Sequence, residues 1–284
     1  MRLIRFGEKF DERPGVLNEQ NERLDCSPYF EDWNSAFWAN DGMRQLEQLL
    51  SENEQELPRV AADARWAAPI ARPGKVVCIG KNYQAHANEL GEDPPAEPLI
   101  FMKAPNATIG PYDTILIPRQ SLKTDWEVEL GVVIGAEARY LSSPAESRAC
   151  VAGYLIANDV SEREFQKDHC GQWTKGKSCD TFLPLGPWLL LADALADPQN
   201  LELTLDVNGE RRQTGNTSDM IFGVDFLIHY LSQFMTLEPG DLICTGTPPG
   251  VGLGMDPPQF LQPGDEVRLT VAGLGEQRCQ CLQA

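Results

Sequence analysis

Two glutamates one residue apart stand in an otherwise apolar stretch that runs from Asp125 to Gly135. In an extended strand, residues i and i+2 point to the same face, so Glu127 and Glu129 would project side by side. Two ionised carboxylates side by side in apolar surroundings are energetically costly unless a cation lies between them. A solvated strand face would also explain the pair, but the apolar neighbours favour a buried site for a divalent metal ion.

A third carboxylate, Asp159, follows the apolar segment Gly153–Asn158. Three carboxylates without a neighbouring histidine or cysteine suit a hard cation that prefers oxygen ligands. We therefore predict that Glu127, Glu129 and Asp159 bind Mg²⁺, with Mn²⁺ as the alternative.

His86 and Glu89 are three residues apart, so one helical turn would place both side chains on the same face. A carboxylate in that position can orient the imidazole as a general base. A single histidine is more often structural, so the spacing alone leaves its role open. The segment from Gly91 to Pro98 is rich in glycine and proline, which suits a lid over a bound substrate.

The elements that must position these residues are mostly short strands. Apolar runs separated by proline and glycine recur along the chain, and this spacing favours a β-rich sandwich or barrel-like body. One helix is expected from Asp225 to Met235, where apolar residues recur near helical spacing. The expected strands lie at 75–80, 113–118, 127–134, 201–207, 241–246 and 265–271.

The first 72 residues contain no histidine and no clustered acid–base pair, so we expect them to lie outside the chemistry. They include a strand-like alternation at Arg2–Phe6 and a helix-like acidic segment around Gln45–Glu56. Pro69, Pro73 and Gly74 then interrupt the chain, which predicts a domain boundary near residue 72.

The chain carries 42 acidic and 24 basic residues, for a net charge of -18. Such a field repels nucleic acid and anionic membrane surfaces, so neither is an expected partner. The sequence has no apolar run long enough to span a bilayer and no secretory signal, so we expect a cytoplasmic protein. The eight cysteines form no CxxC pair and mostly occupy apolar stretches, which is typical of buried, reduced thiols.

Several short motifs follow one another in order after residue 75. They are Gly80-Lys81-Asn82-Tyr83 with His86 and Glu89, Phe101-Met102-Lys103, Glu127-Val128-Glu129-Leu130, Asn158-Asp159-Val160-Ser161 with Arg163 and Gln166, Lys175-Gly176-Lys177-Ser178, Gly186-Pro187-Trp188, Pro239-Gly240-Asp241 and Thr245-Gly246-Thr247-Pro248. Together they resemble the fumarylacetoacetate hydrolase family, and within it the bacterial 2,4-diketo-3-deoxy-L-fuconate hydrolases and so-called ureidoglycolate lyases. Cys179 departs from the family pattern, which usually has phenylalanine there.

The resemblance implies an α+β, β-rich fold, namely a mixed β-sandwich roll over residues 73–284 preceded by a small α/β domain over 1–72. It also implies a homodimer. Glu127, Glu129 and Asp159 would be the metal ligands, in agreement with the carboxylate argument. The other implied site residues are His86, Glu89 and Lys177 as catalytic groups and Lys103, Arg163, Gln166 and Thr247 as substrate contacts.

The resemblance further implies hydrolysis of a carbon–carbon bond in a small anionic diketo acid, giving pyruvate and a carboxylic acid. The substrate would be an acylpyruvate or a 2,4-diketo-3-deoxy sugar acid. The alternatives are oxaloacetate decarboxylation, tautomerisation or hydroxymuconate isomerisation at the same metal site, or a catalytically silent oxoacid-binding protein. His86 and Glu89 favour hydrolysis, because a decarboxylase needs no activated water.

Overall fold

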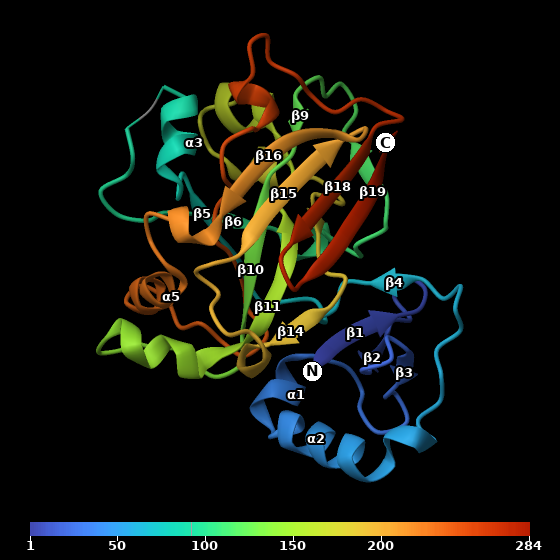
Figure 1. The fold of residues 1–284 in the computed structure, drawn as a ribbon. Helices are drawn as coiled ribbons and strands as arrows, with labels where there is room; N and C mark the ends of the chain where they lie inside the picture. Colours follow the sequence, from blue (N-terminus) through green and yellow to red (C-terminus); the bar gives the residue numbers. More distant parts are fainter. Residues whose placement is uncertain (92) are drawn as a thin grey trace.

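The computed structural model describes residues 1–91 and 93–284 of the chain. Two β-sheets form its centre, and the helices lie around them (Figure 1). The mixed, strand-rich fold expected from the sequence is confirmed. In the part of the chain described, no helix is long and apolar enough to cross a membrane.

The larger sheet has ten strands in the order β3-β2-β1-β14-β11-β10-β17-β5-β6, with β4 paired to β1. Its central antiparallel pair, β10 and β11, is almost wholly buried, because apolar residues occupy both faces of these strands. The strands are β1 Arg2–Phe6, β2 Arg13–Leu17, β3 Arg23–Asp25, β4 Trp66–Ala67, β5 Val76–Gly80, β6 Leu99–Lys103, β10 Val128–Ile134, β11 Val151–Asn158, β14 Leu189–Leu191 and β17 Leu242–Cys244.

The smaller sheet has five strands in the order β16-β15-β18-β19-β8. Buried and less buried residues alternate along β18 and β19, as expected for a sheet with one face on the core and one toward solvent. The strands are β8 Ile115–Ile117, β15 Glu202–Val207, β16 Glu210–Asn216, β18 Glu266–Val271 and β19 Gly275–Gln283.

Two short ladders connect the ends of the main strands. One pairs β7 (Thr108–Ile109) with β13 (Leu183–Pro184). The other pairs β9 (Thr124–Asp125) with β12 (Ser161–Glu162), directly beyond the end of the β10–β11 pair. Residues 126–127 and 159–160, between the β10–β11 ladder and the β9–β12 ladder, are therefore held opposite one another.

The helices are short and lie at the edges of the sheets (Figure 1). The acidic segment expected to be helical begins at Gly42 and continues as a 3₁₀ turn from Glu54 to Glu56. The expected helix at 225–235 ends at Ser232, where the chain tightens into a turn. The helices are α1 Ser35–Ala39, α2 Gly42–Asn53, α3 Gln84–Glu89, α4 Thr174–Lys177 and α5 Val224–Ser232, with further 3₁₀ turns at Pro105–Ala107, Pro144–Cys150, Ala192–Ala194, Thr217–Asp219 and Gly252–Gly254 and a π-helical turn at Glu164–Asp168.

Strands β1–β3 pack with α1 and α2 at one end of the molecule (Figure 1). They also extend the larger sheet, because β1 pairs with β14. The boundary near residue 72 stays a proposal: it separates these elements along the sequence, while the sheet runs across it.

Candidate metal centre and active site

Three buried carboxylates meet where the β10–β11 pair ends. One oxygen from each of Glu127, Glu129 and Asp159 lies within 4.8 Å of the others. Glu127 and Asp159 face each other across the gap between the two ladders, where the Asp159 N–H donates to the Glu127 carbonyl at 3.0 Å. Glu129 follows on the same side of β10, as the i, i+2 spacing predicts.

Two buried lysines lie against these carboxylates. Nζ of Lys177 is 2.8 Å from Glu127 Oε2 and 2.6 Å from Asp159 Oδ2. Nζ of Lys103 is 2.6 Å from Asp159 Oδ1 and also donates to the Val160 carbonyl at 2.9 Å. Burial alone would lower the pKa of Lys177, but Asp159 and Glu127 raise it above its usual value, so this side chain is charged.

Without a metal, the surroundings shift the pKa values of the two glutamates in opposite directions. Burial opposes ionisation of Glu127, but Lys177 and Arg163 outweigh it and hold the pKa of Glu127 far below normal. Burial, followed by repulsion from Asp159, raises the pKa of Glu129 well above normal. The Glu129 carboxylate therefore lacks sufficient positive charge nearby, which a divalent cation held by these oxygens would supply. The carboxylate set thus fits Mg²⁺ or Mn²⁺.

Helix α3 carries His86 toward this centre. Nδ1 of His86 lies 3.1 Å from Glu89 Oε2, one turn along the helix. The other oxygen of Glu89 accepts the Gly250 N–H at 2.8 Å, which fixes the carboxylate. With Nδ1 directed at Glu89, Nε2 of the imidazole is the nitrogen left to exchange a proton in the pocket.

Arg163 joins the cluster of three carboxylates to a second acidic group. Its Nη1 lies 2.8 Å from Glu127 Oε1 and donates to Gln166 Oε1 at 3.1 Å. Its Nε donates to Asp125 Oδ2 at 2.8 Å. Asp125 also accepts the Gly252 and Leu253 N–H groups, so the guanidinium is held in one place.

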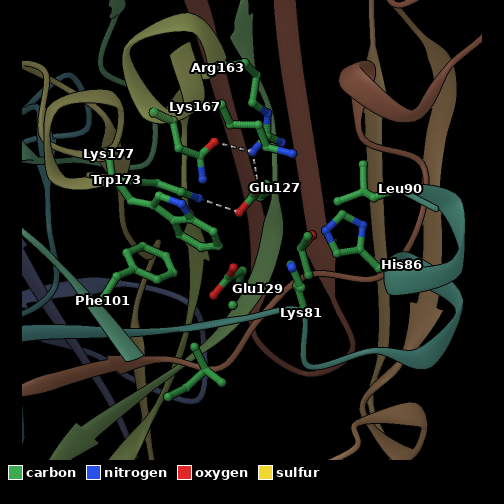
Figure 2. A pocket seen from close by; sticks show the side chains of 14 residues that line it. Lys81, His86, Leu90, Phe101, Glu127, Glu129, Arg163, Lys167, Trp173 and Lys177 are labelled. Carbon is green, nitrogen blue, oxygen red and sulfur yellow. Dashed lines mark hydrogen bonds and ion pairs between the residues drawn. The ribbon is translucent and has the colours of Figure 1, made fainter. Parts of the chain in front are cut away.

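A pocket with about 410 Å³ of empty space, including its opening, lies over these groups. Figure 2 shows His86 and Leu90 on one side and Phe101, Trp173 and Lys177 on the other, with Glu127 and Glu129 between them. The rings of Phe101 and Trp173 are 5.2 Å apart and form an apolar wall. The pocket therefore offers carboxylates at its base and an apolar side for a small substrate.

The structure brings the residues expected from the sequence together. Seven of them line the pocket, and three lie behind these. Asp159, Lys103 and Glu89 do not line the pocket and contact it through other site residues. The residues that do line it are His86, Glu127, Glu129, Arg163, Gln166, Lys177 and Thr247.

Sequence reasoning assigned no role to several other lining residues, among them Trp173, Leu90, Lys81 and Lys167. Apolar residues and isolated lysines carry no pattern that separates a pocket wall from the core or the surface. The expected lid from Gly91 to Pro98 includes Glu92, which lies outside the described residues. Within the described part of this segment, Glu97 accepts a hydrogen bond from the Tyr230 hydroxyl at 2.8 Å.

The chain is similar to several known proteins. The family described as fumarylacetoacetate (FAA) hydrolase C-terminal matches residues 75–281. A Burkholderia multivorans protein, named in general terms as a hydrolase with no stated substrate, is 48% identical over 280 residues, covering 98% of this chain and 97% of its own.

Two similar solved structures cover all of this chain. Maleylpyruvate hydrolase from Sphingobium sp. SYK-6, solved with manganese(II) and pyruvate, has a TM-score of 0.82, is 29% identical and is itself covered over 100%. 5-Carboxymethyl-2-hydroxymuconate delta-isomerase from Mycobacterium smegmatis has a TM-score of 0.76, is 32% identical and is covered over 99%.

Proposed function

Because the chain belongs to the fumarylacetoacetate hydrolase family, we propose that it is a magnesium-dependent hydrolase that cleaves a carbon–carbon bond in a small diketo acid. The products would be pyruvate and a second carboxylic acid. The observation that carries this proposal is the placement of His86, oriented by Glu89, on the same pocket as the carboxylates Glu127 and Glu129. The manganese and pyruvate bound by the related maleylpyruvate hydrolase support it.

Each charged group has a task in this proposal. Glu127, Glu129 and Asp159 would hold the metal, which when bound supplies a Lewis acid for the 2-oxo acid end of the substrate. Lys177 adds a fixed positive charge where the pyruvate part of the substrate becomes an enolate. Arg163 and Gln166 present hydrogen-bond donors to the substrate carboxylate, for which a guanidinium is well suited.

His86 would activate the water. Its Nε2 takes a proton from the water while Nδ1–H donates to Glu89, so the imidazolium that forms is stabilised. The water oxygen bonds to the carbonyl carbon remote from the carboxylate. The carbon–carbon bond then breaks and its electron pair passes to the pyruvate carbon as an enolate. Protonation of that carbon, balanced by release of the proton that His86 took from the water, completes the reaction.

The other reactions that such a site supports differ in their need for water. Oxaloacetate decarboxylation, tautomerisation and the isomerisation named for the Mycobacterium smegmatis relative all pass through an enolate but consume no water. They would require the metal carboxylates and Lys177, but no general base directed at a water molecule. We favour hydrolysis because His86, oriented by Glu89, is such a base.

A substrate screen tests the proposal. The purified protein would be incubated with Mg²⁺, Mn²⁺ or EDTA and with acylpyruvates, 2,4-diketo-3-deoxy sugar acids, oxaloacetate and hydroxymuconates. Pyruvate release would be followed by a coupled assay, and the second product identified by mass spectrometry. We expect Mg²⁺-dependent pyruvate release from a diketo acid, with one water added to the products. Isomerised or decarboxylated products without any hydrolysis would overturn the proposal.

We further propose that the protein is cytoplasmic and that it works as a homodimer, of which the homodimer is what the family resemblance implies. Size-exclusion chromatography with light scattering would test the oligomeric state. A mass of 31.5 kDa, that of one chain, at micromolar concentration would contradict the dimer.

A further inference from the structure

Val128 separates the two glutamates of the metal centre, so the orientation of its peptide groups sets the positions of both carboxylates. On one side, β10 pairs with β11 along its whole length. On the other side, pairing with β17 covers Gly131 to Val133. Val128 lies beyond this pairing, and two side chains make the hydrogen bonds to its N–H and carbonyl that a neighbouring strand would otherwise make.

The first of these side chains is Gln213 on β16, 85 residues away in sequence. Its Oε1 accepts the Val128 N–H at 2.9 Å. Its Nε2 donates to Thr247 Oγ1 at 2.8 Å and to the Pro248 carbonyl at 2.8 Å. Gln213 is fully buried, so water does not compete for these bonds.

The second is Thr247, whose hydroxyl donates to the Val128 carbonyl at 2.9 Å. The hydrogen bonds thus form a closed ring through Val128, Gln213 and Thr247. The chemistry of the groups fixes every direction in the ring. A backbone N–H can only donate, so the amide oxygen of Gln213 faces Val128, and a carbonyl can only accept, so the Thr247 proton faces Val128 as well.

We propose that Gln213 is a positioning residue of the metal centre, acting with Thr247 to hold Glu127 and Glu129 at the angle that binds the cation. This rests on the proposed function, because it takes these carboxylates to be the metal ligands. The ring also gives Thr247 a role different from the substrate contact expected from the sequence. Its only hydroxyl proton is committed to Val128, so in this state it offers the substrate no donor.

The physical reason for a large effect is burial. Removal of the Gln213 amide leaves the Val128 N–H and the Pro248 carbonyl without their partner in a dry environment, where unpaired backbone groups are costly. The first residues of β10 would then turn to find other partners. Because Asp159 is held separately by Lys103, the three carboxylates would lose their common geometry.

The test is the affinity for Mn²⁺, measured by calorimetry or electron paramagnetic resonance on the full chain well below its melting temperature. Gln213→Met removes the ring bonds at similar volume. Thr247→Val removes the hydroxyl, and Thr247→Ser keeps it. We expect Gln213→Met and Thr247→Val each to weaken Mn²⁺ binding about 10- to 100-fold, the usual effect of losing a group that orients a metal ligand. Thr247→Ser should retain wild-type affinity.

Gln277→Met is the matched control. Gln277 is also fully buried and donates to three backbone carbonyls, those of Ile156, Pro184 and Gly186. Its loss should lower the melting temperature without changing Mn²⁺ affinity. Because Gln213 and Thr247 act in one ring, their double variant should lose no more affinity than the worse single variant.

Wild-type Mn²⁺ affinity in a folded Gln213→Met protein would overturn the inference, as would an equal loss of affinity in Gln277→Met. If Gln213→Met does not fold, the contrast between Thr247→Val and Thr247→Ser decides the matter, and equal affinities in that pair would overturn the inference. A wild-type protein that binds Mn²⁺ but cleaves no diketo acid would refute the proposed reaction and leave the ring intact. Absence of any Mn²⁺ binding by the wild type would refute both.

Discussion

Nδ1 of His86 lies 3.1 Å from Oε2 of Glu89, and a hydrogen bond from a segment outside their helix also holds Glu89 in place. Glu89 also accepts the Gly250 N–H through its other oxygen. The turn that begins at Gly250 therefore sets the orientation of the imidazole. Asp125 holds the same turn through the Gly252 and Leu253 N–H groups, and it also binds Arg163.

Gly254 tests whether this turn controls the imidazole. A Cβ added at Gly254 would lie 2.5 Å from Glu89 Cδ and Cγ, which is too close for any real contact. Gly254→Ala should therefore displace Glu89 and misorient His86, and we expect diketo acid cleavage to fall about 10- to 100-fold, as for other small misplacements of catalytic groups. Steady-state kinetics would measure this, with Mn²⁺ affinity expected to stay the same.

Gly74→Ala is a suitable control, because its added Cβ would meet only an oxygen of Asp241, at 3.1 Å. That variant should keep wild-type activity. Unimpaired cleavage by Gly254→Ala would show that the carboxylate of Glu89 has room to adjust, and that the turn does not set its orientation.

Lys177 contacts two of the proposed metal ligands, so in this proposal its charge competes with that of the metal. Its Nζ occupies a place between Glu127 and Asp159. Lys177→Met should lower kcat by about 10²–10³-fold, since it removes a fixed positive charge that stabilises the transition state. Affinity for Mn²⁺ should stay the same or rise, because one cation is no longer close to the metal ligands.

The matched control is Lys175→Met, on the same short helix but exposed. It should change neither kcat nor metal affinity. If Lys177→Met instead weakens metal binding and leaves kcat intact at saturating metal, Lys177 serves to organise the ligands and takes no part in the chemistry.

Part of this site could be predicted because it is encoded locally. The i, i+2 spacing of Glu127 and Glu129 in a strand and the i, i+3 spacing of His86 and Glu89 in a helix both fix a shared face. The structure has these pairs on the expected elements, with Glu127 directly before β10. Strand-rich architecture could likewise be read from short apolar runs between turn residues.

The contacts between distant segments could not be predicted in the same way. Lys103 is 56 residues from Asp159, and Gln213 is 85 residues from Val128. No periodicity in the sequence encodes such pairs, because they depend on which strands become neighbours. A glutamine or lysine that will be buried against a carboxylate or a backbone group resembles any surface residue until the sheets are assembled.

Metal removal should affect stability in a pH-dependent way through Glu129. In the folded, metal-free protein the pKa of Glu129 is raised, by burial first and then by Asp159. For an acid, a raised folded-state pKa means that stability is lost as pH rises above its ordinary value of about 4.3. With EDTA present, Glu129→Gln should therefore melt above the wild type at pH 8, and this difference should shrink toward pH 5.

Thermal denaturation of both proteins across this pH range would measure the effect, at about 2–4 °C for each kcal/mol. Excess Mg²⁺ should reverse the order at pH 8, because only the wild type gains the stabilisation of a bound cation. A difference in melting temperature that does not vary with pH would mean that Glu129 is not the group responsible.

The last prediction separates hydrolysis from the other enolate reactions, and it depends on the difference between stabilising an enolate and activating water. In the proposed mechanism, the three carboxylates that hold the metal and Lys177 serve both kinds of reaction, whereas His86 and Glu89 serve only the step that consumes water. His86→Ala should therefore lower diketo acid cleavage by roughly 10²–10⁴-fold, the usual contribution of a positioned general base. Any oxaloacetate decarboxylation should largely survive, because it needs only the metal and a stabilised enolate.

Pyruvate release from both substrates would be compared among the wild type, His86→Ala and Glu89→Gln at saturating Mg²⁺. Glu89→Gln should do less damage than His86→Ala, since Glu89 orients the imidazole without accepting the proton from water. Mg²⁺ affinity should barely change in either variant, because neither residue is among the three carboxylates that meet at the metal centre. Equal losses on both substrates would place His86 in enolate chemistry, and a wild-type rate of diketo acid cleavage in His86→Ala would mean that another group activates the water.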